Sequence, residues 1–273
     1  FTEYSDLILK FRKISIITVY DFILENYQNY NEINYKKILL KDKCIKKADY
    51  IFTISNTVGK KITKKYPGKK VFITPLGVDH NNFYNEKIND FKDILIPNKN
   101  YILYVGNKNG YKNFKLLLDC FEKNKLINNN FNLVLFGGEK ILNNNLLNNK
   151  IFQLYGNDSL LRKLYSNCSL YINTSKEEGF GLPVLEAMAC KSPILCSDIE
   201  VFREVTENSV HYFDCNSSSD LSIKIEMLLN KKFLLKDSID KAYKISLKKD
   251  WQSVSNSLIQ FYKVILKDNH VTI

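Results

Sequence analysis

The sequence contains no apolar run close to the ~20 residues that a helix needs to cross a bilayer, which argues against a membrane-spanning protein. It has no initiating Met and no signal-peptide pattern, so we expect the numbering to start inside a longer chain. The six cysteines form no C-x-x-C pair or zinc-like spacing, and the three histidines are isolated. These absences argue against a disulfide-framed secreted domain and a metal cluster, and favour buried free thiols in a reducing compartment.

Positively charged residues, in contrast, are abundant. The 273 residues carry a formal net charge of +11, with lysines spread nearly everywhere beside many Asn, Ile and Tyr residues, which we interpret as a compositional bias. The densest basic segment, Lys60–Lys70, could attract anionic lipid or nucleic acid, but a solvated helix face and turn is the favoured interpretation. No RNA-binding motif, helix-turn-helix signature or zinc finger accompanies it, so we predict no nucleic-acid partner.

Apolar and aromatic residues make up 45% and 13% of the chain, as in folded globular proteins. Before Pro97, strands are expected at residues 14–20, 50–55 and 70–78, and helices at 35–47 and 56–65. Ser55 or Asn56 is suited to cap the second helix. The polar, Asn-rich stretch from residue 79 to Pro97 is predicted to connect two domains.

A second series of strands and helices follows. Strands are predicted at residues 101–106, 131–138, 151–156, 169–175, 192–197 and 209–214, with helices between them and from residue 219 onward. Nearly continuous apolar strands separated by helices indicate a parallel sheet covered on both faces. The Asn-rich stretches 124–132 and 143–150 are predicted to be loops.

The predicted fold class is therefore α/β, with two Rossmann-like, doubly wound domains. Residues 98–250 form a complete domain in this prediction. A domain of this kind usually takes about 100–150 residues, so residues 1–97 are expected to be the C-terminal part of another, with its opening strands missing.

Two loops after predicted strands carry the candidate site. The first, from Gly106 to Asn113, holds Lys108 and Lys112, and the second, from Lys176 to Pro183, holds a glycine turn that opens a helix. Because ligands of open α/β sheets bind beyond the carboxyl ends of the strands, both loops are expected to point into one crevice. Helix N-terminal amides combined with lysines suit a diphosphate.

Glu178 and Glu186 flank the glycine turn. Phosphate would repel carboxylates, so these two side chains are expected to contact uncharged hydroxyl groups of the same ligand. A hydroxyl-rich molecule with a diphosphate in its middle is a nucleotide sugar. The sequence therefore predicts that Glu178, Glu186 and Lys112 converge on one pocket for such a ligand.

The segment "EGFGLPVLE" resembles the signature of the retaining GT-B glycosyltransferases of the group-one or family-four type, in which seven residues separate two glutamates. The similarity runs from about Ile14 to Tyr262. Other stretches that agree are "ADYIFTISNTVGKKI", "VFITPLGVD", "YILYVGNKNGYKNFKLLLDCF", "YSNCSLYINTSKEEGFG", "AMACKSPILCSDI", "REVTENSVHYFD" and "DWQSVSNSLIQFYKVIL".

The resemblance assigns roles to the residues of these loops. Glu178 would bind hydroxyls of the transferred sugar, Glu186 would bind the ribose, and Lys112 with Lys108 would neutralise the diphosphate. The donor-binding set that the resemblance implies is completed by Gly106, Gly179 and the amides of Phe180, Gly181 and Leu182. Residues 251–273 would be a helix that crosses back to the first domain.

Two positions depart from the usual pattern of the family. Lys108 stands where the family usually has Arg, which keeps the charge but loses the bidentate fork. Tyr20 stands where the family usually has His, beside Asp21. Tyr20 and Asp21 are therefore the candidates for the acceptor side of the site.

The resemblance also implies partners and a setting. The donor would be a GDP- or UDP-linked sugar and the acceptor a glycan or a lipid-linked molecule, in bacterial-type cell-surface polysaccharide or lipopolysaccharide synthesis. No metal and no other cofactor is expected. The predicted location is cytoplasmic, with peripheral contact to the inner face of the membrane left open.

Three alternatives remain. A nucleotide-sugar epimerase of similar fold would bind the same donor without an acceptor. A non-catalytic nucleotide-sugar-binding protein would bind the donor without turnover. A basic nucleic-acid-binding protein would show steeply salt-dependent affinity that is indifferent to Glu178.

Overall fold

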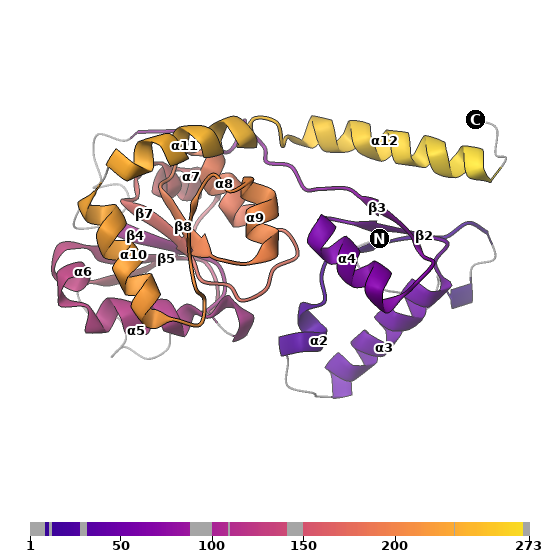
Figure 1. Cartoon of the computed structure of the whole chain (residues 1–273), viewed down its shortest axis with the longest axis horizontal. Coiled ribbons are helices and arrows are strands. Elements are labelled where there is room, and N and C mark those ends of the chain that lie inside the picture. Colours follow the sequence, from indigo (N-terminus) through magenta and orange to yellow (C-terminus); the bar gives the residue numbers. More distant parts are fainter. Residues whose placement is uncertain are drawn as a thin grey trace. The chain divides into compact units, whose positions relative to one another are not determined.

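The computed structural model in Figure 1 describes residues 9–10, 13–27, 32–87, 100–108, 110–140, 150–231 and 233–269. The chain divides into two compact units. The first comprises Phe1–Gly77, Glu178–Phe180 and Trp251–Ile273, and the second comprises Val78–Glu177 and Gly181–Asp250.

The first unit contains a parallel sheet of three strands in the order β1-β2-β3. The strands are β1 (Ile16–Val19), β2 (Tyr50–Thr53) and β3 (Lys70–Ile73), and the helices are α2 (Ile23–Tyr27), α3 (Glu32–Lys47), α4 (Asn56–Lys65) and α12 (Trp251–Asp268). Ser55 caps α4, because its side chain accepts a hydrogen bond from the Val58 amide, as the sequence predicted.

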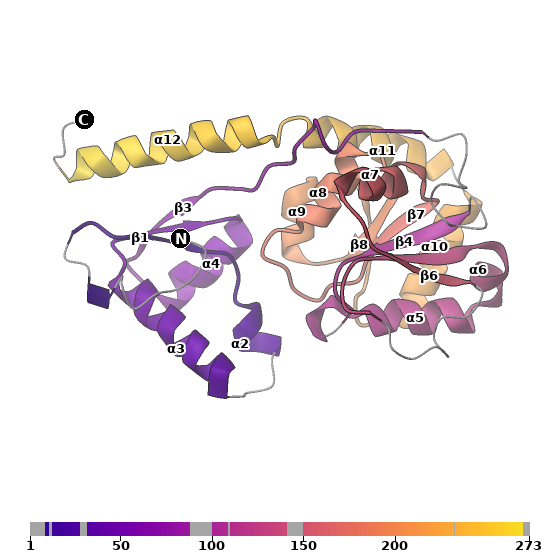
Figure 2. The same ribbon diagram turned by 180° about the vertical axis from the view of Figure 1, so that it is seen from behind.

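Both faces of this sheet are covered. Ile45 of α3 and Ile62 of α4 belong to the cluster on one face, and Phe261 and Ile265 of α12 pack with Phe52 on the other. Figures 1 and 2 show this arrangement, with α3 and α4 on the side of the sheet opposite to α12.

The second unit contains six parallel strands in the order β6-β5-β4-β7-β8-β9. The strands are β4 (Tyr101–Val105), β5 (Asn132–Phe136), β6 (Ile151–Leu154), β7 (Leu170–Asn173), β8 (Ile194–Ser197) and β9 (His211–Phe213). This is the doubly wound order, in which the chain leaves β4 toward one edge and returns at β7 to build the other half. The predicted fold class is confirmed.

The helices of the second unit are η2 (Gly110–Lys112, a 3-10 turn), α5 (Phe114–Lys123), α6 (Lys125–Asn130), α7 (Asp158–Asn167), α8 (Leu182–Ala189), α9 (Glu200–Thr206), α10 (Ser218–Asn230) and α11 (Phe233–Ser246). Helices α5, α6 and α10 share one large apolar cluster with the strands. Their buried residues include Leu117, Ile127 and Leu228, all less than 3% exposed.

One local prediction was wrong and two fall partly outside the described residues. Stretch 124–132 was expected to be a loop, but it contains α6, because the Asn124 side chain accepts from the Ile127 amide and the Ile127 side chain is buried in the core. Part of each of two other predicted segments lies outside the described residues. These parts are residues 88–97 of the connection predicted from residue 79 to Pro97, and residues 143–149 of the loop predicted at 143–150.

The expectation of free thiols is confirmed. All six cysteines are unpaired with one another, and five of them are buried. Within the described residues no helix is both long and apolar enough to cross a membrane. Over the same residues no group of three or more His, Cys, Asp or Glu side chains is arranged to hold a metal ion.

Candidate functional site

The topology of the second unit fixes where a ligand site is expected. Strands β4 and β7 are neighbours in the sheet, with Leu103 opposite Tyr171, although more than sixty residues separate them in the chain. Since the connections that follow them run to opposite faces, a crevice is expected between the two loops at their carboxyl ends. These are the two loops in which the sequence predicted lysines and a glycine turn.

Hydrogen bonds join these two loops. The Thr174 hydroxyl, one residue after β7, donates to the Lys112 carbonyl at 2.8 Å. The Lys176 amide donates to the Tyr111 carbonyl at 2.7 Å. The backbone of Lys112 is therefore held against the loop after β7, and the Lys112 ammonium lies 5.1 Å from the centre of the Tyr111 ring.

Gly181 lets the second loop turn into α8. It is the residue before the helix, its φ of 97° lies in the left-handed region, and its carbonyl accepts from the Val184 amide at 2.9 Å. A Cβ at this position would lie 2.6 Å from the Phe202 ring. Pro183 has no amide hydrogen, and the Leu185 amide also donates to the Gly181 carbonyl, so the Leu182 amide is the candidate donor for a ligand in the first turn of α8.

Glu186 lies on α8 in a partly buried position. The Tyr165 hydroxyl of α7 donates to its Oε2 atom at 3.2 Å. Burial raises the pKa of the Glu186 carboxyl to about 7; the Tyr165 hydrogen bond opposes this shift, and the Asp158 charge adds to it. A carboxylate that water solvates poorly accepts hydrogen bonds from ligand hydroxyls strongly.

Tyr165 is itself fixed by packing. Its ring is fully buried and lies edge-on to the Tyr171 ring, with 5.2 Å between the ring centres. The Phe83 ring lies 6.4 Å away. This packing leaves the hydroxyl of Tyr165 little freedom other than to point at Glu186. The sequence gives no sign of this pair, because the two residues are 21 positions apart on different helices.

Glu178 follows β7 by five positions and is 9% exposed. It belongs with Gly179 and Phe180 to the residues grouped with the first unit. Phe180 and Gly179 are buried as well. The convergence of Glu178 with Glu186 and Lys112 on one pocket stays a prediction.

The Lys108 side chain makes hydrogen bonds that the sequence did not indicate. Its ammonium donates to the carbonyls of Gly137 and Glu139, each at 2.9 Å. The Gln153 side chain donates to the same two carbonyls, so both side chains hold the turn after β5. Burial lowers the pKa of Lys108, and the Glu139 charge opposes that shift.

The glycine pair after β5 is a feature of this sheet edge that the sequence analysis missed. Gly137 and Gly138 have φ values of 71° and 68°. A Cβ on Gly138 would lie 2.4 Å from the Gly106 carbonyl oxygen, so the loops after β4 and β5 touch through their backbones. The signal was present as "FGG" at the end of a predicted strand, which is typical of close backbone approach.

The two acceptor-side candidates lie in the first unit. Tyr20 directly follows β1, and Asp21 is next to it. The Asp21 carboxylate accepts from the Ile23 amide at 3.0 Å, and its carbonyl accepts from the Lys41 ammonium. Asp21 therefore has a local structural role at the start of α2. Its part in binding an acceptor stays a prediction.

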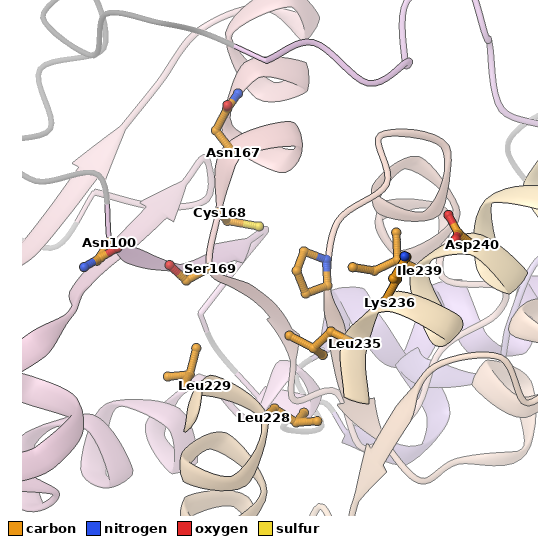
Figure 3. A pocket seen from close by; sticks show the side chains of 11 residues that line it. Asn100, Asn167, Cys168, Ser169, Leu228, Leu229, Leu235, Lys236, Ile239 and Asp240 are labelled. Atoms are coloured by element: carbon orange, nitrogen blue, oxygen red, sulfur yellow. The ribbon is translucent and has the colours of Figure 1, made fainter. Parts of the chain in front are cut away.

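A hollow of about 480 Å³ lies at the other end of the second sheet. Asn100, Ser169 and Pro193 lie just before β4, β7 and β8, so this hollow is at the amino ends of the strands (Figure 3). Leu235 and Ile239 of α11 form its apolar side. It is distinct from the candidate site at the carboxyl ends.

Comparisons with known proteins show the family of the chain. The model of the family described as glycosyl transferases group 1 matches residues 86–245, and the chain belongs to this family. It is 30% identical over 190 residues to the O-antigen chain mannosyltransferase RfbU of Salmonella typhimurium, covering 65% of this chain and 50% of that one.

Two further similarities concern a lipid-linked substrate and the fold. An N,N'-diacetylbacillosaminyl-diphospho-undecaprenol alpha-1,3-N-acetylgalactosaminyltransferase of Campylobacter jejuni is 26% identical over 184 residues, with 65% of this chain and 48% of that one covered. The chain thus spans about half the length of these relatives. HepE of Anabaena, solved with UDP-glucose, has a TM-score of 0.74 at 16% identity over 94% of this chain and 73% of that one. The fold is that of the GT-B glycosyltransferases.

Proposed function

We propose that this chain binds a nucleoside diphosphate sugar and transfers the sugar, with retention and without a metal ion, to a glycan or lipid-linked acceptor. The observation that carries the proposal is the pair of hydrogen-bonded loops after β4 and β7, which holds Lys112 at the switch point of a doubly wound sheet. The names of the relatives, an O-antigen mannosyltransferase and an undecaprenol-linked sugar transferase, support cell-surface polysaccharide or lipopolysaccharide synthesis as the setting.

Charge separation is the step that the donor site would assist. When the bond between the anomeric carbon and the diphosphate oxygen breaks, the electron pair leaves with the nucleoside diphosphate. The Lys112 ammonium and the amides of Gly181 and Leu182 at the start of α8 would stabilise that charge. Donors placed before the reaction contribute about 2–4 kcal/mol each to such a step.

Lys108 would act mainly by shaping the site. Because its ammonium already donates to the Gly137 and Glu139 carbonyls, it keeps at most one donor for a phosphate oxygen. Lys112 is therefore the principal phosphate partner in this proposal. Gly106 would allow the diphosphate to approach the backbone closely, since its φ of 117° is open only to glycine.

The two glutamates would bind the uncharged ends of the donor. Glu186 would accept from the ribose hydroxyls, and Glu178, with the Gly179 and Phe180 backbone, would accept from the hydroxyls of the transferred sugar. Tyr20 and Asp21 would lie on the acceptor side. The donor is either GDP- or UDP-linked, and the chain would act at the inner face of the cytoplasmic membrane.

Thermal denaturation with nucleotide sugars tests donor binding. We expect one of UDP-glucose, UDP-N-acetylglucosamine, GDP-mannose and their nucleotides to raise the melting temperature selectively, because a ligand that binds only the folded state stabilises it by mass action. Glu186→Gln should lose most of this shift, whereas Glu200→Gln, an exposed carboxylate on α9, should keep it. Absence of a shift with every nucleotide sugar would refute the proposal.

The reaction itself separates the alternatives. With a lipid-linked or oligosaccharide acceptor, nucleotide release should depend on the acceptor. Release or sugar isomerisation without an acceptor would indicate an epimerase. Donor binding with no release under any condition would indicate a non-catalytic binding protein.

A further inference from the structure

Asparagine directly precedes α5, α6 and α7 in the second unit, and the asparagine before α5 differs from the other two. Asn124 and Asn157 cap α6 and α7, because their side chains accept hydrogen bonds from amides in the first turn. This is the usual role of asparagine at the start of a helix. The Asn113 side chain, by contrast, makes no capping hydrogen bond to α5. It contacts a different part of the fold.

The contact of Asn113 lies on the far side of the sheet. Its side-chain amide donates to the Cys215 carbonyl at 2.8 Å, although 102 positions separate the two residues. Cys215 follows β9, which is three strands away from β4 in the sheet. At about 4.8 Å per strand this is a distance of about 14 Å. The turn η2 and Asn113 therefore lie across the carboxyl ends of β7 and β8.

The backbone of Asn113 allows this path. Its φ of 53° and ψ of 30° lie in the left-handed region, which asparagine adopts more readily than most residues with a side chain. Its amide donates to the Gly110 carbonyl and its carbonyl accepts from the Leu116 amide, each at 3.1 Å. Asn113 is thus the bend between η2 and α5. Residues in such conformations cluster at functional sites.

The loop that receives this hydrogen bond is braced by its own contacts. The Asp214 amide donates to the Asp220 carboxylate at 2.8 Å. The Asn216 amide donates to the Asp214 carboxylate at 2.9 Å. Ser217 caps α10, since its side chain accepts from the Asp220 amide. The Cys215 carbonyl is therefore a fixed anchor between β9 and α10.

Lys112 lies between two long-range hydrogen bonds. Its own carbonyl accepts from the Thr174 hydroxyl after β7 at 2.8 Å. The next residue, Asn113, is bound to the loop after β9. Three loops thus fix the backbone that carries the Lys112 side chain. A charged donor held in place before the reaction stabilises developing charge most effectively, because it need not rearrange.

We propose that Asn113 is a positioning residue for Lys112. Its left-handed backbone and its hydrogen bond to Cys215 hold the Lys112 ammonium at the diphosphate position before the nucleotide sugar arrives. This inference rests on the proposed function, in which Lys112 is the principal phosphate partner. Asn113 does not contact the donor itself. Its contribution is that the loop is already ordered, so that less conformational entropy is lost on binding.

A purely structural role for the same hydrogen bond makes a different prediction. A bond that only braces two loops would stabilise the fold, and its removal would affect nucleotide binding in the same way with or without the Lys112 ammonium. A positioning residue affects binding through the group that it positions. The experiment must therefore separate stability from affinity, and then test whether the effect on affinity depends on Lys112.

Calorimetric titration of the full chain with UDP-glucose and with GDP-mannose measures the affinity. Asn113→Gly accepts the positive φ without strain but removes the amide, so affinity for the nucleotide sugar that binds should fall about fivefold. Asn113→Ala removes the amide and also strains the backbone, so affinity should fall by about twentyfold or more. Unchanged affinity in both variants would overturn the inference.

Asn208 provides a matched control in the same unit. It has a φ of 58°, and its side chain accepts from the Arg203 guanidinium at 2.8 Å. It precedes β9, so it lies at the amino end of the strand that Cys215 follows. Asn208→Gly and Asn208→Ala should lower the melting temperature but leave nucleotide affinity unchanged. Equal losses of affinity in the two pairs of variants would overturn the inference, because affinity would then follow stability.

A double-mutant cycle with Lys112 gives the decisive readout. Lys112→Gln alone should weaken binding by about tenfold or more. In that background Asn113→Gly should change the affinity by less than about twofold, because the group that it positions is gone. A persistent fivefold loss would overturn the inference in favour of a structural role. A wild type that binds no nucleotide sugar would refute the proposed function as well, whereas unchanged affinity of the Asn113 variants refutes this inference alone.

Discussion

In the first unit, Asp42 and Asp49 keep their charge because neighbouring side chains stabilise it. Burial acts against both, but hydrogen bonds from Lys46 and Tyr66 to Asp42, and from Ser15 to Asp49, lower their pKa values. In the second unit, burial raises the pKa of Glu186, and the hydrogen bond from the Tyr165 hydroxyl offsets this shift only in part. The charges of Asp42 and Asp49 are thus stabilised by the fold, whereas the charge of Glu186 is destabilised by it.

This difference follows from what each unit exposes. The first unit presents lysine-covered helices, which supply counter-charges for any carboxylate near them. The second unit has two hydrogen-bonded loops at the carboxyl ends of β4 and β7, where the proposed ligand would bind. Groups with strongly shifted pKa values are characteristic of binding sites.

The largest predicted effect concerns the cost of the Glu186 charge. Its pKa is about 7 in the folded chain and about 4.5 in the unfolded chain, so folding favours the protonated form. Stability from this group is present below pH 4.5 and is lost as the pH rises through 7, by on the order of 3 kcal/mol. Denaturant unfolding of wild type and Glu186→Gln at pH 5 and pH 8 measures it, and the variant should lose most of this pH dependence.

The opposite sign is expected of the first unit. Because the pKa values of Asp42 and Asp49 are lowered, their contribution is present above the unfolded pKa and is lost as the pH falls through the folded one. The single Trp251 lies in the first unit and reports its unfolding by fluorescence. The first unit should therefore not lose stability between pH 5 and pH 8. If it does, and if Glu186→Gln abolishes that loss, the contrast between the two units is wrong.

The second prediction compares two glycines with positive φ. Gly181 has a φ of 97° and the Phe202 ring beside it, whereas Gly68 of the first unit has a φ of 83° and nothing near its missing Cβ. Gly68→Ala should cost about 1 kcal/mol from backbone strain alone. Gly181→Ala should cost about 2–3 kcal/mol, because the ring must move as well. Urea unfolding of both variants measures the difference, and equal losses would remove the packing argument for Gly181.

Much of this architecture could be predicted from the sequence. The strands of the second unit are short apolar runs between helical segments, and that pattern alone indicates a parallel sheet. Helix α6 could not be predicted in this way, because half of its six residues are asparagines and its formation depends on the burial of Ile127. Local propensity is a weak guide where one tertiary contact decides.

The candidate site was only partly predictable for the same reason. The two loops and their lysines follow from the strand ends, and the structure shows that these loops are hydrogen-bonded to each other. The engagement of Lys108 with the Gly137 carbonyl and of Tyr165 with Glu186 depends on side-chain positions across the fold. Spacing along a sequence carries no signal for such contacts.

The third prediction tests Tyr165 as a residue that positions Glu186. Tyr165→Phe removes one hydrogen bond to a buried carboxylate, so it should lower stability by about 1–2 kcal/mol at pH 8 and raise the pKa of Glu186 further. The pH at which nucleotide affinity reaches half its maximum should therefore move upward. Calorimetric titration across pH measures this midpoint; a purely structural role for Tyr165 would weaken binding equally at every pH.

The smallest predicted effect concerns the lysines of the first unit. Lys60 and Lys64 lie four positions apart on α4, a like-charge pair that costs a helix about 0.2–0.5 kcal/mol. Lys64→Gln should therefore raise the free energy of unfolding by up to that amount at low salt, and the gain should vanish at high salt. Lys241→Gln on α11 is the matched test in the second unit, where Asp237 precedes Lys241 by four positions, and it should lower stability slightly. Equal responses of the two variants would mean that the like-charge pair on α4 carries no electrostatic cost for the fold.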